Sequence, residues 1–157
     1  MSEYNLIEGK SKLDNAKITV VASRFNSFVV DRLLEACLGT LKTSGLSDQD
    51  ITIVRVPGAF EIPSAVQHVI KHSECDAIIT LGAVIRGDTP HFEYICSECA
   101  RGLGQISIEN DIPVIFGVLT VDNTEQAMDR AGAEESNKGS ESAQAAIEMV
   151  NVFRALK

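Results

Sequence analysis

The sequence predicts an α/β protein with three layers, α/β/α, built around a four-stranded parallel sheet. Three observations support this prediction: four short runs rich in apolar and β-branched residues, segments of helical period between them, and a length of 157 residues, which suits one domain. The runs occupy residues 18–22, 51–56, 77–85 and 114–119. Strands that are apolar throughout must be covered on both faces, so their alternation with helices favours parallel strands with right-handed crossovers.

The segment after the first expected strand has the period of a helix. Its apolar residues fall on one stripe, and Gly45 follows as a residue suited to end a helix. This stripe comprises Val30, Leu34, Cys37 and Leu41. The last helix is expected over about residues 140–156 and should pack against the sheet through Ala143, Ile147, Val150 and Phe153.

Residues 1–16 are polar and are expected to form an arm. The apolar anchors of this arm are Tyr4, Leu6, Ile7 and Leu13. Four strands leave two open sheet edges, and an exposed edge favours pairing with another chain. We therefore expect residues 1–157 to form one domain whose N-terminal arm extends onto a neighbouring subunit.

Composition and charge exclude several classes of function. The net charge is −8 and no cluster of Lys and Arg occurs, which argues against nucleic acid or an anionic membrane as the main partner. No apolar run approaches the ~20 residues of a membrane span, and the N-terminus lacks the apolar core of a signal peptide. We expect a cytoplasmic protein that binds anionic substrates through a few placed cations.

The spacing of cysteine and histidine residues does not predict a metal centre. Cys96 and Cys99 form a C-x-x-C pair, which can mark a redox site or half of a zinc site. No second pair has zinc-ligand spacing, and residues 94–100 are expected inside a helix, so a buried structural role is favoured. His68 and His72 lie four residues apart, but a solvated helix face explains them better. All cysteines are expected to be reduced.

The segments that follow the expected strands carry the most informative side chains. In an open parallel sheet, ligands bind beyond the carboxyl ends of the strands. These segments are residues 23–26, 57–63, 86–93 and 120–123. Phe25 and Phe60 offer aromatic rings that can stack on a planar ligand, although either taken alone would also fit a core. The phosphate-loop and dinucleotide fingerprints are absent, so ATP and NAD are not expected, and neither is any other cofactor.

The third of these segments predicts a phosphate site. Thr89 suits the N-cap of a helix and Pro90 its first position, so His91 should lie in the first turn. Free backbone N–H groups and the helix dipole attract a phosphate there, and they favour the neutral imidazole that accepts a proton. A histidine that only caps or packs is the alternative. Arg130 and Lys138 lie between two expected helices, where either cation taken alone would be a solvated charge.

Five motifs, in sequence order, resemble the lumazine synthases. They are Arg24-Phe25-Asn26, residues 56–63, residues 81–87, residues 89–94 and Asn137-Lys138-Gly139, within a match from about residue 17 to residue 156. The resemblance implies a flavodoxin-like topology. It also implies the penultimate step of riboflavin biosynthesis, in which 5-amino-6-(D-ribitylamino)uracil and 3,4-dihydroxy-2-butanone 4-phosphate give 6,7-dimethyl-8-ribityllumazine and phosphate.

The same resemblance implies a role for individual residues. The pyrimidine substrate would contact Phe25, Ala59, Phe60, Glu61, Ala83, Val84, Ile85 and Phe116, the phosphate would contact Asp88, Thr89 and Arg130, and His91 would move protons. Phe116 and Arg130 would come from an adjacent chain. Asp88 stands where relatives commonly carry a small neutral residue, and its carboxylate would repel a phosphate unless only its backbone N–H faces the ligand. No role follows for Lys138.

The resemblance further implies a homo-oligomer built on pentamers, with active sites shared between adjacent subunits and riboflavin synthase as a candidate partner. Residues 133–136 replace a stretch that is often basic and glycine-containing in members that form sixty-subunit shells. Pentamer, decamer and icosahedral shell therefore stay open. The alternatives from other classes are a non-catalytic flavin- or ribityl-binding protein, a shell-forming protein and a thiol redox protein. His91 argues against the first of these.

Overall fold

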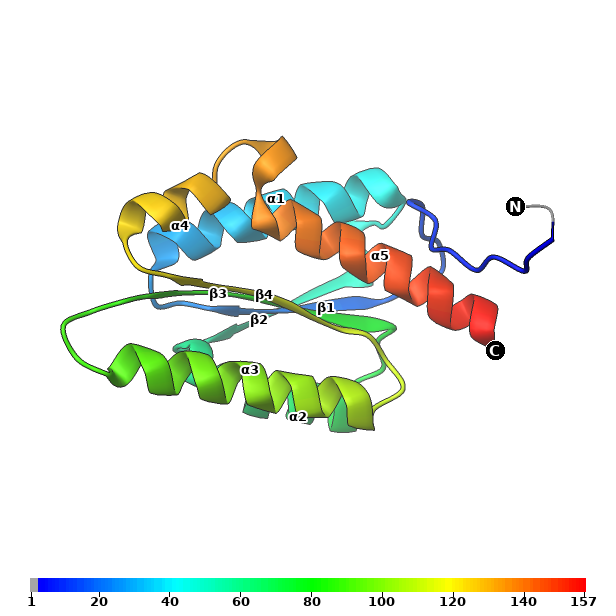
Figure 1. Cartoon of the computed structure of the whole chain (residues 1–157). Helices are drawn as coiled ribbons and strands as arrows, with labels where there is room; N and C mark the ends of the chain where they lie inside the picture. The colour runs from blue at the N-terminus through cyan, green and yellow to red at the C-terminus, as the bar shows by residue number, and fades with distance from the viewer. Residues whose placement is uncertain (1–2) are drawn as a thin grey trace.

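Four parallel strands form one sheet between two layers of helices in the computed structural model, which describes residues 3–157 (Figure 1). Residues 1 and 2 of the predicted arm lie outside the described residues. The strands are β1 (Ile18–Ser23), β2 (Ile51–Val56), β3 (Ala77–Ile85) and β4 (Val114–Val121). Their order in the sheet is β2-β1-β3-β4, and all neighbours are parallel. This is the flavodoxin-like order, so the predicted fold class is confirmed.

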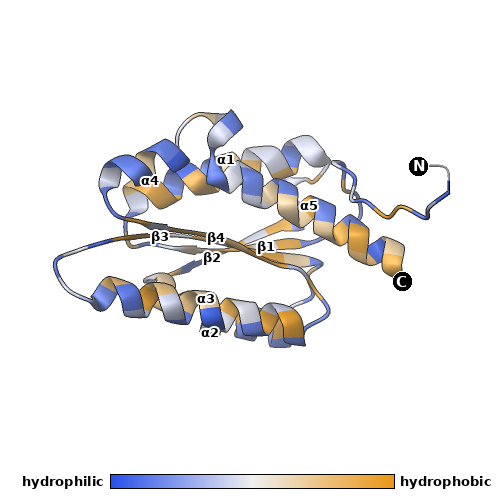
Figure 2. Cartoon of the chain, in the orientation of Figure 1, coloured by the Kyte–Doolittle hydropathy of each residue, from blue (hydrophilic) through white to orange (hydrophobic). Residues whose placement is uncertain are grey.

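Helices cover both faces of the sheet. One face is covered by α1 (Ser27–Ser44), α4 (Thr124–Arg130) and α5 (Lys138–Leu156), and the other by α2 (Ile62–His72) and α3 (His91–Glu109) (Figure 1). Short 3-10 helices, η1 (Asp48–Asp50), η2 (Ala59–Glu61) and η3 (Glu134–Ser136), lie in the connections. Apolar colour concentrates on the strands and the inward helix faces (Figure 2). The sheet therefore separates two apolar cores, one on each face.

The core on the α1 and α5 face is the larger of the two. Leu33 of α1, Ile79 of β3 and Ile147 of α5 have no exposed surface. Burial of an aliphatic side chain of this size contributes about 1.5–3 kcal/mol. Gly139 allows the start of α5 to approach α1, because a Cβ there would lie 1.9 Å from the carbonyl oxygen of Leu33.

The helix ends follow specific caps. Gly45 ends α1 as predicted and has a φ of 126°, a conformation that glycine adopts without strain. α5 begins two residues before the predicted start because Asn137 caps it. The Asn137 side chain accepts hydrogen bonds from the backbone N–H groups of Gly139, at 2.8 Å, and Ser140, at 3.3 Å.

The prediction that all four strands are buried is wrong for β2. Thr52, Ile53 and Arg55 are exposed in the single chain. β2 is an edge strand, so one of its sides has no neighbouring strand and the helices cover it incompletely. β4 is the other edge, and it extends two residues beyond the prediction, to Val121.

The arm divides into a packed part and an extended part. Leu13 and Ala16 belong to the core. Side chains of α5 bind the backbone of residues 10–15. The Asn151 side chain donates to the carbonyls of Lys10 and Lys12, and the Arg154 side chain to those of Asp14 and Asn15. Tyr4, Leu6 and Ile7 are 74%, 61% and 41% exposed. Apolar side chains thus remain uncovered on the extended part.

Candidate active site

A pocket of about 170 Å³ opens beyond the carboxyl ends of β1 and β3. Its lining is Phe25, Asn26, Ala59, Ala83, Val84, Ile85, Gly87, Thr89, His91, Phe92 and Ile95. The structure therefore brings together most of the residues assigned above to the pyrimidine, with Thr89 and His91. The floor is neutral, because it consists of small and aliphatic residues at the end of β3.

The turn after β1 leaves the Phe25 ring outside the core. The Phe25 backbone N–H donates to the carbonyl of Pro57 at 3.0 Å, and the Asn26 side chain donates to the carbonyl of Ala83 at 2.8 Å. Asn26 has a φ of 61°, a left-handed conformation that asparagine tolerates better than most residues. These contacts fix the turn against β3 and leave the Phe25 side chain 71% exposed at the pocket.

The segment after β2 contributes Ala59 to the pocket lining, and Phe60 and Glu61 follow it in the chain. The Glu61 carboxylate accepts a hydrogen bond from the backbone N–H of Gly58 at 2.9 Å, which folds η2 into one turn. Ala59 lines the pocket, whereas Phe60 is 57% exposed and Glu61 is partly buried next to it. Phe60 and Glu61 do not line the pocket of the single chain.

The start of α3 differs by one residue from the prediction. The helix begins at His91, and Pro90 rather than Thr89 stands at its N-cap. Proline has no N–H to satisfy, and the Thr89 hydroxyl accepts a long hydrogen bond from the His91 N–H, at 3.4 Å. His91 keeps its place in the first turn and is exposed at the pocket edge. Asp88 is exposed beside Thr89 and does not line the pocket.

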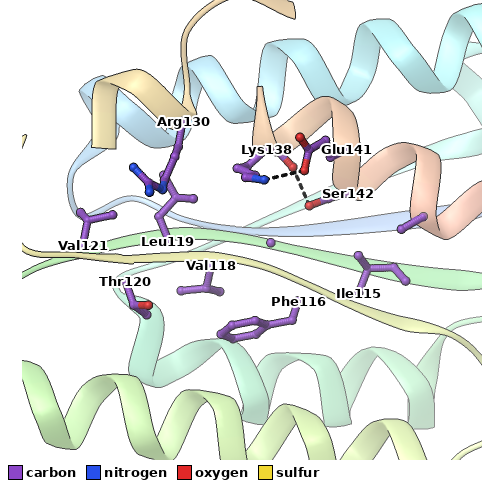
Figure 3. A pocket seen from close by; sticks show the side chains of 12 residues that line it. Ile115, Phe116, Val118, Leu119, Thr120, Val121, Arg130, Lys138, Glu141 and Ser142 are labelled. Carbon is purple, nitrogen blue, oxygen red and sulfur yellow. Dashed lines mark hydrogen bonds and ion pairs between the residues drawn. The ribbon is translucent and has the colours of Figure 1, made fainter. Parts of the chain in front are cut away.

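A second pocket, of about 430 Å³, lies along β4 and the start of α5 (Figure 3). It is lined by Ile115, Phe116, Gly117, Val118, Leu119, Thr120, Val121, Arg130, Lys138, Glu141, Ser142 and Ala145. Arg130 and Lys138 lie on one side of β4 and Phe116 on the other (Figure 3). Because β4 is an edge strand, a molecule that approaches from outside can reach both sides. Within one chain, Phe116 and Arg130 do not line the pocket of Phe25 and His91.

The two cations of the second pocket differ in their partners. The Lys138 ammonium forms an ion pair with Glu141 at 2.7 Å. The Arg130 guanidinium donates one hydrogen bond to the carbonyl of Gln126, at 3.0 Å, and a guanidinium carries five N–H donors. Arg130 is exposed, so its remaining donors can reach an anion.

Cysteine chemistry does not explain the site. All four cysteines, which lie within the described residues, are free thiols. Burial raises the pKa of Cys99 to about 11, and burial followed by the charge of Glu93 raises the pKa of Cys96. A redox pair needs a lowered thiol pKa, so these values favour the structural role predicted for both residues.

Metal ligation and membrane insertion find no structural support in residues 3–157. No group of three or more His, Cys, Asp or Glu side chains in this range could hold a metal ion. His68 and His72 are exposed on α2 with their ring centroids 5.8 Å apart. No described helix is long and apolar enough to cross a membrane.

Several pocket residues were given no role by sequence reasoning. Asn26, Gly87, Phe92 and Ile95 line the first pocket, and Lys138 and Glu141 line the second. Asn26 could have been found, because an asparagine in the short connection between a strand and a helix suits a left-handed turn. The positions of Phe92 and Ile95 follow from the path of α3, which the sequence does not fix.

A pocket of this kind, with an aromatic ring and a histidine beyond the carboxyl ends of parallel strands, is typical of α/β enzymes that act on small molecules. The family model described as 6,7-dimethyl-8-ribityllumazine synthase matches residues 15–154, and the chain belongs to this family. The recognition made from the five motifs is thereby confirmed. The family consists of transferases with lumazine synthase activity in riboflavin biosynthesis, which makes the chain an enzyme of that class.

Proposed function

We propose that this enzyme condenses 5-amino-6-(D-ribitylamino)uracil with 3,4-dihydroxy-2-butanone 4-phosphate to form 6,7-dimethyl-8-ribityllumazine and phosphate. The observation that carries this proposal is the first pocket, which has a neutral floor and is lined by the exposed Phe25 ring and by His91. A flat, uncharged pyrimidine suits a stacking ring and a neutral floor. Membership of the lumazine synthase family supports the same reaction.

His91 is the proposed proton carrier. Imine formation, phosphate elimination and ring closure all require proton transfers, and none requires an electron acceptor. A general acid or base that is correctly placed is worth about 10²–10⁴ in rate, and alignment of two substrates adds to this. His91 lines the same pocket as the floor residues of β3, from the first turn of α3.

Arg130 is the proposed phosphate ligand, together with Thr89 and the backbone of Asp88. Arg130 retains free donors, and planar guanidinium groups bind phosphate through paired hydrogen bonds. The exposed Asp88 carboxylate would repel a phosphate, so this residue contributes only its N–H. The proposed phosphate site thus combines the N-terminus of α3, at the first pocket, with Arg130, at the second pocket.

The active site is proposed to form between adjacent subunits of a pentameric ring. Phe25 and His91 line one pocket, whereas Phe116 and Arg130 line another that opens along the β4 edge. Head-to-tail contacts bring such unlike surfaces together and close naturally into rings. The exposed Tyr4, Leu6 and Ile7 of the arm supply an apolar contact for a neighbour. A mass measurement in solution distinguishes a ring of five from a decamer or a sixty-subunit shell.

The proposed reaction is tested by mixing the purified protein with both substrates and following the absorbance of the lumazine. Product should form only when both substrates are present, with phosphate released in equal amount. Binding of the pyrimidine without any product would instead favour a non-catalytic ribityl-binding protein. The setting proposed for the reaction is the cytoplasm, with riboflavin synthase as the proposed partner.

A further inference from the structure

The side chain of Arg86 joins the two ends of the segment from Arg86 to Glu93. Arg86 directly follows β3, and its guanidinium forms an ion pair with Glu93, in the first turn of α3. Four residues between these two line the first pocket, and Thr89 and His91 are among them. The ion pair therefore joins the two ends of the loop that carries the proposed phosphate ligand and proton carrier.

The same guanidinium reaches a third element. Its Nε donates to the Asp122 carboxylate at 2.9 Å, directly after the end of β4. The Asp122 backbone N–H donates to the Gln126 side chain at 2.8 Å, and the Gln126 carbonyl accepts the hydrogen bond from Arg130. Hydrogen bonds to Asp122 and Gln126 thus connect Arg86 with Arg130, one of the two cations of the second pocket.

Arg86 also packs on the wall of the first pocket. Its guanidinium carbon lies 4.4 Å from the centre of the Phe92 ring, and Phe92 lines that pocket. The other hydrogen bonds of this segment are that of the Arg86 backbone N–H to the Val121 carbonyl at 2.9 Å, the long one from the His91 N–H to the Thr89 hydroxyl, and the turn from Glu93 to Pro90. Of these three, only the first reaches another element, and it holds the backbone at Arg86. An arginine fork suits this place, because it holds two carboxylates at fixed angles and stacks on an aromatic face, which a lysine does not reproduce.

We propose that Arg86 is a positioning residue, which bridges Glu93 and Asp122 and so fixes His91 and Thr89 on one side and α4 with Arg130 on the other. This inference rests on the proposed function. Arg86 itself lines neither pocket, so it acts through other residues. If sites are shared between subunits, one guanidinium orders groups that serve two neighbouring active sites.

The test compares Arg86→Met and Arg86→Lys with a matched control, Arg101→Met. Arg101 is also exposed and pairs with Glu98 of α3 at 2.7 Å, about 15 Å along that helix from His91. Displacement of reacting groups by about 1 Å can cost 10²-fold, so Arg86→Met should lose roughly 10- to 100-fold in kcat/KM for the four-carbon phosphate. The KM for the pyrimidine should change less than about twofold, and Arg86→Lys should recover little. Arg101→Met should behave as the wild type.

Two further measurements decide the result. The double variant Arg86→Met with Glu93→Gln should be no worse than Arg86→Met alone, because both changes break the same contact. Amide hydrogen exchange of residues 87–93 should be faster in Arg86→Met than in Arg101→Met, a readout that needs no activity. The inference would be overturned if the activity losses of the two single changes multiplied in the double variant, or if Arg86→Lys restored full activity. Amide exchange of residues 87–93 that is no faster in Arg86→Met than in Arg101→Met would also overturn it. A wild type that makes no lumazine would refute the proposed function alone, since the exchange result does not depend on turnover.

Discussion

The replacement Gly139→Ala adds one Cβ atom at the contact between α5 and α1, and the structure gives the atoms that this Cβ would meet. The added Cβ would lie 1.9 Å from the carbonyl oxygen of Leu33, and 2.6 and 2.8 Å from its carbonyl carbon and Cα. All three are backbone atoms, so no side-chain rotation relieves the clash. Ordinary contact begins near 3.4 Å, which means that the two helices must separate by roughly 1.5 Å at this point.

The cost of this separation can be estimated from the structure. Overpacking costs about 1–3 kcal/mol, and a clash between backbones lies at the upper end. The Asn137 cap, which accepts the Gly139 N–H at 2.8 Å, is strained as well, at about 1 kcal/mol. Together the two terms amount to about 4 kcal/mol, which lowers the Tm of a chain of this length by roughly 8–16 °C.

Thermal unfolding followed by circular dichroism measures the effect of Gly139→Ala. Gly39→Ala is the matched control, because Gly39 lies inside α1 and no atom stands within 4 Å of its added Cβ. That control should gain about 0.5–1 kcal/mol from helix propensity. A Gly139→Ala protein as stable as the wild type would refute the reasoning about this helix contact.

Three further predictions concern the site and the dependence of stability on pH. His91→Ala should lower kcat by about 10²–10⁴ and leave KM nearly unchanged in steady-state assays, and near-full turnover would mean that the role is misassigned. Arg130→Ala should raise the KM for the four-carbon phosphate about 10- to 100-fold and spare the pyrimidine, whereas equal weakening would indicate a structural role. Hydrogen bonds from Lys17 and then Ser47 lower the pKa of Asp50 from 3.8 to about 2. Since the folded pKa lies below the unfolded one, Asp50 stabilises the fold above about pH 4 and loses this contribution as the pH falls towards 2. The stability difference between wild type and Asp50→Asn in urea should shrink over that window, and a constant difference would contradict the assignment.

The sequence predicted the sheet well because its strands are strongly apolar and β-branched. All four strands start at the predicted residue, and the errors occur where other forces act. β4 continues through the polar Thr120, because pairing with β3 satisfies its backbone there. The exposure of β2 follows from the strand order, which the pattern along the chain does not contain.

The candidate site was predicted in part, because topology places the segments after β1, β2 and β3 together. This rule points to the segments that hold Phe25, Ala59 and His91, and the resemblance to the family then singles out Ala59. It could not find the bridge that Arg86 makes to Asp122, since those residues are 36 positions apart and meet only in the folded chain. Nor could it separate one pocket from the other, which depends on the path of α4 and α5.

Mixed refolding tests the central claim most directly, namely that lumazine is made at sites shared between subunits. Unfolded His91→Ala and Arg130→Ala chains would be combined in equal amounts and refolded together. If the chains assemble at random, roughly a quarter of the interfaces pair an intact His91 with an intact Arg130 from the next chain. Activity should then return to about that fraction of the wild-type value. Activity no greater than the average of the two variants, with co-assembly demonstrated, would show that each site lies within one chain.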